Sequence, residues 1–214
     1  MPRRVPQHPV NLELDGRPVL VVGAGRVAAR KTLDLLEAGA LVTVVAPQVG
    51  EELAALADEG RVSLRTRGFE PDDLDGCWFV VTATDDAATN AAVRAEGDRR
   101  HIFVNSADDP VNCSATLPAR VRRGELLVTV STGGRAPAVS SWLRAWLEEA
   151  LGDEHARLVE LVGEIRDELH AADRTTEGLD WQRALGSGTL ELIREGRLAE
   201  AKERLEACLS SSSD

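Results

Sequence analysis

The first half of the chain alternates between short apolar runs and stretches in which apolar residues recur at helical spacing. Val19–Val22 and Leu41–Val45 are continuous apolar runs of strand length, and Leu33 and Leu36 recur between them. Continuous apolar runs are typical of parallel strands that are covered on both faces. The pattern therefore predicts a strand, a helix and a second strand, the beginning of an α/β domain.

The same alternation continues to about residue 110. Residues 1–16 form an arm in which Val10, Leu12 and Leu14 alternate as in an edge strand. After the second strand, the pattern predicts a helix over 51–59, a strand over 62–66, a helical turn over 71–74, a strand over 77–82, a helix from 87 to about 97 and a strand over 101–105. Asp85 or Asp86 is expected to cap the helix that begins at residue 87.

The pattern changes near Asn112, where we place a domain boundary. Residues 114–118 and 125–130 are predicted to be strands with no helix between them, separated by the basic segment 120–123. A helix with Pro137 near its start follows, and from 153 to 208 the spacing predicts further helices. The helix that begins near Pro137 carries a wide apolar stripe: Val139, Trp142, Leu143, Trp146, Leu147 and Ala150. Such a stripe is expected in the core or at a subunit interface.

Composition excludes several classes of protein. The chain has 214 residues, 43% of them hydrophobic, which suffices for one large or two modest domains. The N-terminal residues lack the apolar region of a signal peptide, and no apolar run has the length of a membrane span. Cys77, Cys113 and Cys208 follow no disulfide or zinc pattern and are interpreted as small structural residues. We therefore expect a cytoplasmic protein that has no membrane partner.

The net charge of −11 is unevenly distributed. Residues 148–214 carry 17 acidic and 8 basic residues, whereas residues 120–147 carry five arginines against Glu125 alone. An acidic protein with one basic segment is not typical of a general nucleic-acid binder. The basic segment indicates either a place for a small anionic ligand or a solvated basic surface.

A glycine-rich turn joins the first predicted strand to the first predicted helix. Its sequence, Gly23-Ala-Gly-Arg-Val-Ala28, fits the pattern G-x-G-x-x-G/A of dinucleotide-binding Rossmann domains. Gly23 permits a tight turn, Gly25 lets the backbone approach a pyrophosphate, and the helix N-terminus offers N–H groups to the phosphates. The position between two apolar strands favours this interpretation over a glycine turn that binds no nucleotide.

The acid that usually holds the adenosine ribose is missing. The end of the second predicted strand reads Ala46-Pro47-Gln48, with neither a carboxylate nor an arginine for a 2′-phosphate. Ribose contacts would come from backbone groups near Pro47 and from Gln48. The motif therefore leaves the choice between NAD and NADP open.

Polar residues follow two further predicted strands, at the sheet edge where α/β proteins bind ligands. Thr82 and Thr84 are placed to contact a cofactor, or to serve simply as turn and cap residues. Asp108 and Asp109 are adjacent, so at most one of them is expected to face the crevice. A second glycine loop, 131–136, precedes a predicted helix and suits a carboxylate or a phosphate.

Six motifs occur in an order that resembles the precorrin-2 dehydrogenase family, whose members are the dehydrogenase/ferrochelatase module of siroheme synthase and similar stand-alone enzymes. The motifs are Val22-Gly-Ala-Gly-Arg-Val-Ala-Ala-Arg-Lys31, Leu35-Leu-Glu-Ala-Gly-Ala40, Val42-Thr-Val-Val-Ala-Pro47, Thr82-Ala-Thr-Asp-Asp86, Val104-Asn-Ser-Ala-Asp-Asp-Pro110 and Val130-Ser-Thr-Gly-Gly-Arg-Ala-Pro137. The resemblance covers residues 9–150, and the C-terminal helices match only in type and length.

The resemblance implies a Rossmann-type parallel-sheet domain over 1–112, a small α+β dimerisation domain over 113–150 and a helical domain over 151–214. It implies a homodimer that uses NAD to oxidise precorrin-2 to sirohydrochlorin. Some relatives also insert Fe²⁺ as a substrate. In some relatives the loop that matches Ser131 and Thr132 is phosphorylated.

The resemblance also implies roles for individual residues. Asp108 matches the family's important aspartate, which we expect to orient the substrate and accept a proton. Cofactor contacts are expected at Gly23, Gly25, Arg26, Val27, Pro47, Gln48, Thr82 and Thr84. The substrate is a tetrapyrrole with eight carboxylates, and arginines suit such groups. Its contacts are expected at Asn105, Arg120, Arg123, Ser131, Thr132, Gly133 and Arg135. No metal ligands are expected, because the four histidines are scattered.

Two other classes of function remain open from the sequence. A nucleotide-sensing regulatory module would also carry the glycine turn, although such modules normally keep the acid that this chain lacks. A protein that binds a tetrapyrrole without turning it over would share the basic segment. Chelatase activity, its metal, and the use of the product for siroheme or cobalamin also remain open.

Overall fold

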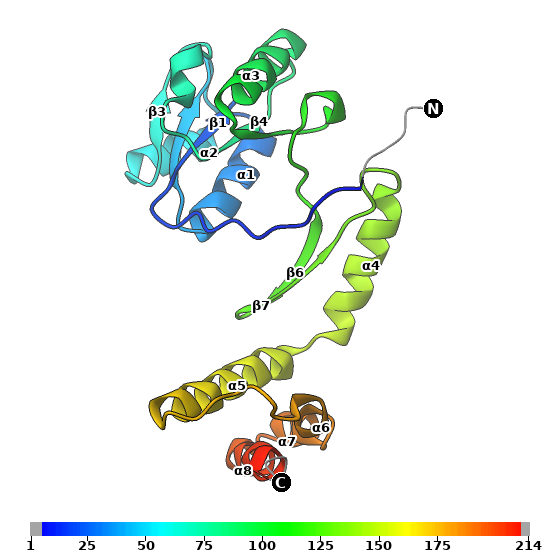
Figure 1. Ribbon diagram of the computed structural model, residues 1–214. Coiled ribbons are helices and arrows are strands. Elements are labelled where there is room, and N and C mark those ends of the chain that lie inside the picture. Colours follow the sequence, from blue (N-terminus) through cyan, green and yellow to red (C-terminus); the bar gives the residue numbers. More distant parts are fainter. Residues whose placement is uncertain (1–5, 211–214) are drawn as a thin grey trace. The chain divides into compact units, whose positions relative to one another are not determined.

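The computed structural model describes residues 6–210, and the chain divides into two compact units after Leu117 (Figure 1). The first unit has the following elements: β1 (Pro18–Val22), α1 (Arg26–Glu37), β2 (Leu41–Val45), α2 (Glu51–Asp58), β3 (Ser63–Arg65), the 3-10 turn η1 (Pro71–Leu74), β4 (Phe79–Thr82), α3 (Ala87–Arg100), β5 (Phe103–Ser106) and η2 (Pro110–Asn112). Its five strands are all parallel, in the order β3-β2-β1-β4-β5. The α/β prediction for this part of the chain is confirmed.

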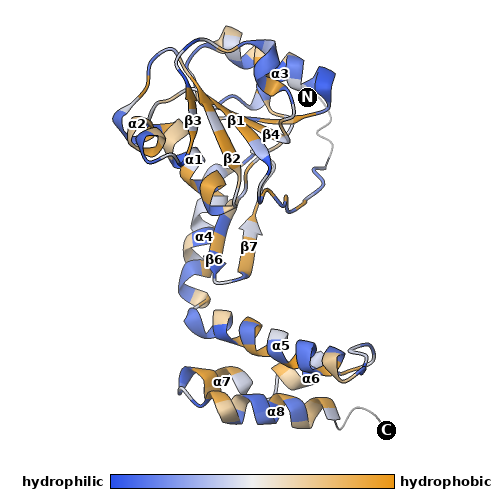
Figure 2. Cartoon of the chain, turned by 90° about the vertical axis from the view of Figure 1, so that its left-hand side faces the viewer, coloured by the Kyte–Doolittle hydropathy of each residue, from blue (hydrophilic) through white to orange (hydrophobic). Residues whose placement is uncertain are grey.

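The sheet is apolar on both faces because alternate strand residues enter two separate cores. Val19 and Val21 of β1 pack with residues of α1 and α2, whereas Leu20 and Val22 pack on the other face with Val93 of α3. Figure 2 shows hydrophobic residues concentrated along these strands. Val19 to Val22 of β1 are all at most 3% exposed, which explains why this part of the strand reads as a continuous apolar run.

The second unit begins with the antiparallel hairpin of β6 (Ala119–Arg123) and β7 (Leu126–Val130). Its helices are α4 (Pro137–Ala150), α5 (Asp153–Ala171), α6 (Trp181–Leu185), α7 (Thr189–Arg194) and α8 (Leu198–Ser210). Leu161 and Ile165 of α5 pack with Leu192 of α7 and Leu205 of α8 in a helical core. The predicted helical C-terminal region is confirmed, and the three-domain division stays a prediction.

Two predicted strands are wrong. Residues 6–14 contain no strand; Val10 is 62% exposed, and Leu14 enters the core from a loop. Residues 114–118 are also irregular, and the strand lies in the basic segment instead. Gly124, at a φ of 55°, and Glu125 form a two-residue turn that brings residues 119–123 against 126–130. Pairing across this hairpin thus overrides the local composition.

The helix α3 begins as predicted but ends later. The Asp86 carboxylate accepts hydrogen bonds from Ala88 N at 3.0 Å and from Thr89 Oγ1 at 2.6 Å, and these contacts lower the pKa of Asp86. The helix then continues past Gly97 to Arg100. A Cβ atom on Gly97 would lie 2.4 Å from Val104 Cγ2, so this glycine serves the close packing of α3 on β5 and does not end the helix.

A buried carboxylate ties the connection between β3 and β4. The Asp73 side chain is fully buried and accepts hydrogen bonds from Arg67 at 2.6 and 2.8 Å, from Arg65 at 2.5 Å and from Glu70 N at 2.9 Å. Burial by itself would raise the pKa of Asp73, but the bonds from Arg67, the Glu70 N–H and Arg65 lower it to about 2.

We expect Asp73→Asn to lower the free energy of unfolding by about 2 kcal/mol at pH 7. Because the folded-state pKa of Asp73 lies below its unfolded value, its contribution is complete above about pH 4 and is lost as the pH falls through about 2. Urea unfolding at pH 7 and pH 3 measures both effects. The control is Asp72→Asn, whose side chain is 90% exposed. A stability difference between the wild type and Asp73→Asn that stayed constant over this pH range would contradict the assignment.

Candidate functional site

The glycine turn lies at the carboxyl end of β1, in the centre of the sheet edge. Gly23 has a φ of 106°, and a Cβ atom on it would lie 2.3 Å from the carbonyl oxygen of Ala83, which follows β4. Its N–H donates to Val45 O of β2 at 2.9 Å. Only glycine satisfies both the backbone conformation and this close approach, so the sequence-based role of Gly23 in a tight turn agrees with the geometry.

The N-terminus of α1 is open to an anionic ligand. Gly25 is the N-cap, and no side chain among the described residues caps the first turn, which also contains no acidic residue. The first helical N–H groups therefore lack intrahelical partners. A Cβ atom on Gly25 would meet nothing within 4 Å, whereas Ala28 is fully buried under the helix. Exposed Arg26 and Val27 complete the first turn. This arrangement fits a dinucleotide pyrophosphate.

The loop after β2 is attached to the glycine turn. Gly50 N donates to Ala24 O at 3.0 Å, while Val45 O accepts from Gly23 N. Pro47 and Gln48 lie between these two attachments, and both are exposed. They are therefore held next to the turn, where ribose contacts were predicted, and their role as cofactor contacts stays a prediction.

The end of β4 differs in part from the prediction. The Thr82 side chain is fully buried, and its hydroxyl donates to Ser106 Oγ of β5 at 2.7 Å. It therefore braces two strands, and a cofactor contact through its hydroxyl does not agree with its burial. Thr84 is half-buried, and its carbonyl accepts from Asn90 Nδ2 at 3.1 Å. Asn90 Oδ1 is buried without a partner in the described part of the chain.

The loop that follows β5 separates the roles of its two aspartates. Asp109 Oδ2 accepts from Asn112 Nδ2 at 2.6 Å, so this carboxylate is engaged within the loop. Asp108 is exposed and has a φ of 58°, a left-handed conformation that is uncommon for aspartate. Asp108 is thus the more exposed of the two aspartates. That at most one of them faces the crevice stays a prediction.

Asp108 and the glycine turn lie along the same edge of the sheet. Both follow the carboxyl ends of parallel strands, and β4 alone separates β1 from β5. Two strand spacings correspond to about 10 Å. Ala107 N donates to Thr82 O, and Ala83 N donates to Val22 O, both at 2.8 Å, so the three strand ends are directly linked.

Two of the predicted substrate residues have structural partners instead. Asn105 is 7% exposed, and its Nδ2 donates to Ala115 O at 3.0 Å. The Arg123 guanidinium donates to the carbonyls of Leu151 at 2.8 Å and of Glu148 at 3.0 Å, at the end of α4. A cation stabilises a helix C-terminus, where carbonyls lack partners. These bonds do not favour the predicted roles of Asn105 and Arg123 as substrate contacts.

The second glycine loop is ordered by two hydroxyl groups. Thr132 Oγ1 accepts from Ala136 N at 3.2 Å, and Ser131 Oγ accepts from Gly133 N at 3.2 Å. Gly133 has a φ of 59°, and Arg135 is exposed. Arg120 is exposed on β6. These residues belong to the second unit, and their contribution to a common site with Asp108 stays a prediction.

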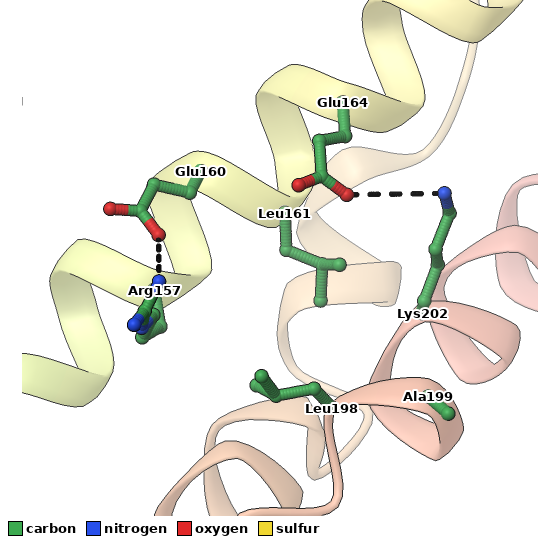
Figure 3. A pocket seen from close by; sticks show the side chains of 7 residues that line it. All are labelled: Arg157, Glu160, Leu161, Glu164, Leu198, Ala199 and Lys202. Carbon is green, nitrogen blue, oxygen red and sulfur yellow. Dashed lines mark hydrogen bonds and ion pairs between the residues drawn. The ribbon is translucent and has the colours of Figure 1, made fainter.

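The cavities of the helical region contain none of the predicted site residues. One, of about 210 Å³, lies between α5 and α8, with Leu161 on its floor and the ion pairs Arg157–Glu160 and Glu164–Lys202 along its rim (Figure 3). A second, of about 240 Å³, is lined by Leu169, Leu179 and Leu209, among others. Both are open grooves on a four-helix packing, and we assign no ligand to them.

Two absences concern residues 6–210. This part of the chain contains no cluster of three or more His, Cys, Asp or Glu side chains that could hold a metal ion. Within the same range, no helix combines the length and the apolar character that crossing a membrane requires.

Sequence reasoning missed two residues that organise this edge of the sheet. Asn90 lies on the buried face of α3, together with Val93 and Gly97. A polar residue at this helical spacing was the signal in the sequence that could have identified it. Cys113 was interpreted only as a small structural residue. Its sulfur contacts the loop that carries Asp108, and no local pattern announces such a contact.

Comparisons with known proteins agree with this site. A family model described as "Putative NAD(P)-binding" matches residues 10–119, just over half of the chain. The siroheme synthase of Photorhabdus laumondii is 36% identical over 206 residues, which are 95% of this chain and 44% of that protein. Siroheme synthase 1 of Yersinia enterocolitica is 40% identical over 204 residues, 94% of this chain and 43% of that protein. The chain thus spans less than half the length of these relatives.

A solved structure is similar over nearly the whole chain. It is described as SirC, precorrin-2 dehydrogenase, with a TM-score of 0.70 and 28% identity, and the match covers 94% of this chain and 98% of the other. The resemblance inferred from the six motifs is confirmed by these relatives. The glycine turn, the open N-terminus of α1, the similarity to siroheme synthases and the family match over residues 10–119 lead to one conclusion: this chain belongs to the family described as putative NAD(P)-binding.

Proposed function

We propose that the protein is an NAD-dependent dehydrogenase that oxidises precorrin-2 to sirohydrochlorin in siroheme or related tetrapyrrole synthesis in the cytoplasm. The observation that carries the proposal is the placement of exposed Asp108 on the same sheet edge as the glycine turn, with β4 alone between their strands. The similarity to a precorrin-2 dehydrogenase over 94% of the chain supports the choice of substrate.

The cofactor would be held by the residues around the glycine turn. The N–H groups at the start of α1 would bind the pyrophosphate, Gly25 would allow its close approach, and Pro47 and Gln48 would lie near the ribose. NAD supplies the hydride acceptor for the reaction. The protein must orient the substrate carbon, exclude water and accept the proton that is released.

Asp108 is the group that we propose for the proton. In the oxidation, the substrate loses a hydride to NAD and a proton to the Asp108 carboxylate, and a new carbon–carbon double bond forms. A carboxylate that is already bound to a neighbouring side chain, as Asp109 is to Asn112, is less suited to this step. Arg120, Arg135 and the loop of Ser131, Thr132 and Gly133 would hold the carboxylates of the tetrapyrrole.

One assay tests the proposal against its alternatives. Purified protein is supplied with precorrin-2 and either NAD or NADP, and the absorbance of sirohydrochlorin is followed. We expect product with NAD. The reaction with NADP measures the preference between the two cofactors, which stays open because the acidic side chain that usually binds the ribose is absent. Binding of NAD without turnover would favour a sensor, and binding of the tetrapyrrole without turnover would favour a carrier. Adding Fe²⁺ to the product tests whether the protein also inserts metal.

We further propose that the protein is a homodimer formed through α4. Trp142, Trp146 and Val139 are 67%, 57% and 44% exposed. Of the two places predicted for this stripe, the core or a subunit interface, this exposure favours the interface. Two exposed tryptophans one helical turn apart favour burial against a second copy.

We expect the double variant Trp142→Glu, Trp146→Glu to be monomeric, because two buried carboxylates would be left without partners at the interface. Analytical ultracentrifugation of the variant and the wild type measures the change. Trp78→Glu is the control, since Trp78 is 55% exposed and lies on the first unit. A dimeric double variant, or a wild type that is monomeric at micromolar concentration, would rule out this interface.

A further inference from the structure

We propose that Cys113 is the positioning residue for Asp108: its thiol closes the loop 106–113 and fixes the conformation that presents the Asp108 carboxylate. This inference rests on the proposed function, because it assigns Cys113 an effect on the reaction through Asp108. It also predicts a property of the loop that can be measured without any substrate.

The sulfur of Cys113 contacts both ends of the segment that contains Asp108. Ser106 N donates to Cys113 Sγ at 3.1 Å, and the thiol faces the carbonyl oxygens of Ser106 at 3.1 Å and of Asp109 at 3.5 Å. In the sequence, Ser106 is followed by Ala107, Asp108 and Asp109. A single side chain thus bridges Ser106, two residues before Asp108, and Asp109, directly after it.

The other end of this bridge is anchored in the sheet. Ser106 is 4% exposed, and its hydroxyl accepts from Thr82 Oγ1 of β4. Ala107 N donates to Thr82 O at 2.8 Å. Because β5 is the last strand of the sheet, no further strand holds its outer side at this point. Cys113 supplies a partner for the Ser106 N–H that a neighbouring strand would supply elsewhere.

The backbone of Asp108 needs such a constraint. A non-glycine residue at a φ of 58° is in a conformation of higher energy, which persists only when the surroundings enforce it. The surroundings include a backbone bond from Asp109 N to Ser106 O at 3.5 Å and the Cys113 thiol. Asn112 N and Nδ2 also donate to Asp109 O at 3.1 Å and to Asp109 Oδ2 at 2.6 Å. Without the thiol, the turn can relax, and the carboxylate would no longer be held in one orientation.

We expect Cys113→Ala to lower kcat for precorrin-2 oxidation about tenfold, since a misplacement of about 1 Å costs one to two orders of magnitude. KM for NAD should stay within about twofold of the wild-type value, because the glycine turn is not touched. Cys113→Ser keeps a donor and an acceptor at this position and should restore most of the rate. A thiol with a merely space-filling role would give the same result for alanine and serine.

Cys77→Ala is the matched control. Cys77 lies in the same unit, is also half-buried, and likewise donates to a backbone carbonyl, that of Asp73 at 3.4 Å. It lies near η1 and not in the loop that carries Asp108. We expect this variant to keep the wild-type kcat, whatever small loss of stability it shares with Cys113→Ala.

A double-mutant cycle tests whether Cys113 acts through Asp108. In an Asp108→Ala background, the further change Cys113→Ala should alter the residual rate less than about twofold. An equal tenfold loss in that background would overturn the proposal, as would a wild-type kcat for Cys113→Ala. The same conclusion would follow if serine were no better than alanine.

Hydrogen exchange separates this inference from the proposed function. The amide of Ser106 should exchange faster in Cys113→Ala than in the wild type and in Cys77→Ala, because its acceptor has been removed. If the wild type fails to oxidise precorrin-2, the proposed function is wrong, and the exchange rates still decide whether Cys113 holds the loop. Unchanged protection of Ser106 would overturn the structural half of the proposal.

Discussion

Replacing Asp108 with asparagine should lower kcat for precorrin-2 oxidation by about 100-fold or more, the usual size of a lost acid–base group. Asparagine retains the size of the side chain and tolerates a left-handed backbone, so the loop should keep its shape. What is lost is the negative charge and the ability to accept a proton. NAD affinity should not change, because Asp108 lies two strands from the glycine turn.

Steady-state kinetics with precorrin-2, together with calorimetric titration of NAD, measure both parts of this expectation. Asp85→Asn is the matched control, since Asp85 is an exposed aspartate at the carboxyl end of the neighbouring strand β4. Asp109→Asn gives a second comparison within the same loop. A larger loss of activity in Asp109→Asn than in Asp108→Asn would contradict the assignment and would indicate Asp109 as the proton acceptor.

Replacing Gly23 with alanine should abolish NAD binding and destabilise the fold by several kcal/mol, which is in the upper range for single substitutions. The new Cβ would lie 2.3 Å from the backbone oxygen of Ala83, and a φ of 106° is strained for any residue with a side chain. The clash is with backbone, so relief requires β1 and β4 to move apart at the cofactor edge.

Gly25→Ala provides the contrast that distinguishes folding from binding. Gly25 has a φ of −84°, and a Cβ there meets no protein atom within 4 Å. We expect this variant to unfold at the wild-type temperature and yet bind NAD much more weakly, since the methyl group would occupy the space of the pyrophosphate. Thermal unfolding and NAD titration of both variants suffice. A Gly25→Ala protein with wild-type NAD affinity would argue against a dinucleotide at this turn.

The parallel sheet and the glycine turn could be predicted from the sequence because their signals are local. Val19–Val22 is apolar throughout, because alternate residues enter two different cores. Burial on both faces can therefore be predicted from four consecutive apolar residues. Gly23 is required by its own backbone conformation. The spacing of strand ends and polar residues predicted a role for the pair Asp108 and Asp109, and the family resemblance selected Asp108.

The partners of individual polar side chains were decided only by the tertiary structure. Thr82 bonds to Ser106, Asn105 to the carbonyl of Ala115, and Arg123 to that of Leu151. These partners lie 10 to 28 residues apart, so hydropathy and spacing carry no information about them. For the same reason, a polar residue at a strand end was predicted to contact a ligand when it in fact holds another strand.

The fold also gives a physical reason for the choice between two adjacent residues. Asp108 and Asp109 are equivalent as letters, and the pairing of Asp109 with Asn112 distinguishes them. The basic segment 119–123 became a strand because the turn at Gly124 pairs it with 126–130. Local pattern determined the strands of the parallel sheet and the nucleotide edge. Hydrogen bonding, which depends on the distances between atoms in the folded chain, decided which side chains remain available for chemistry.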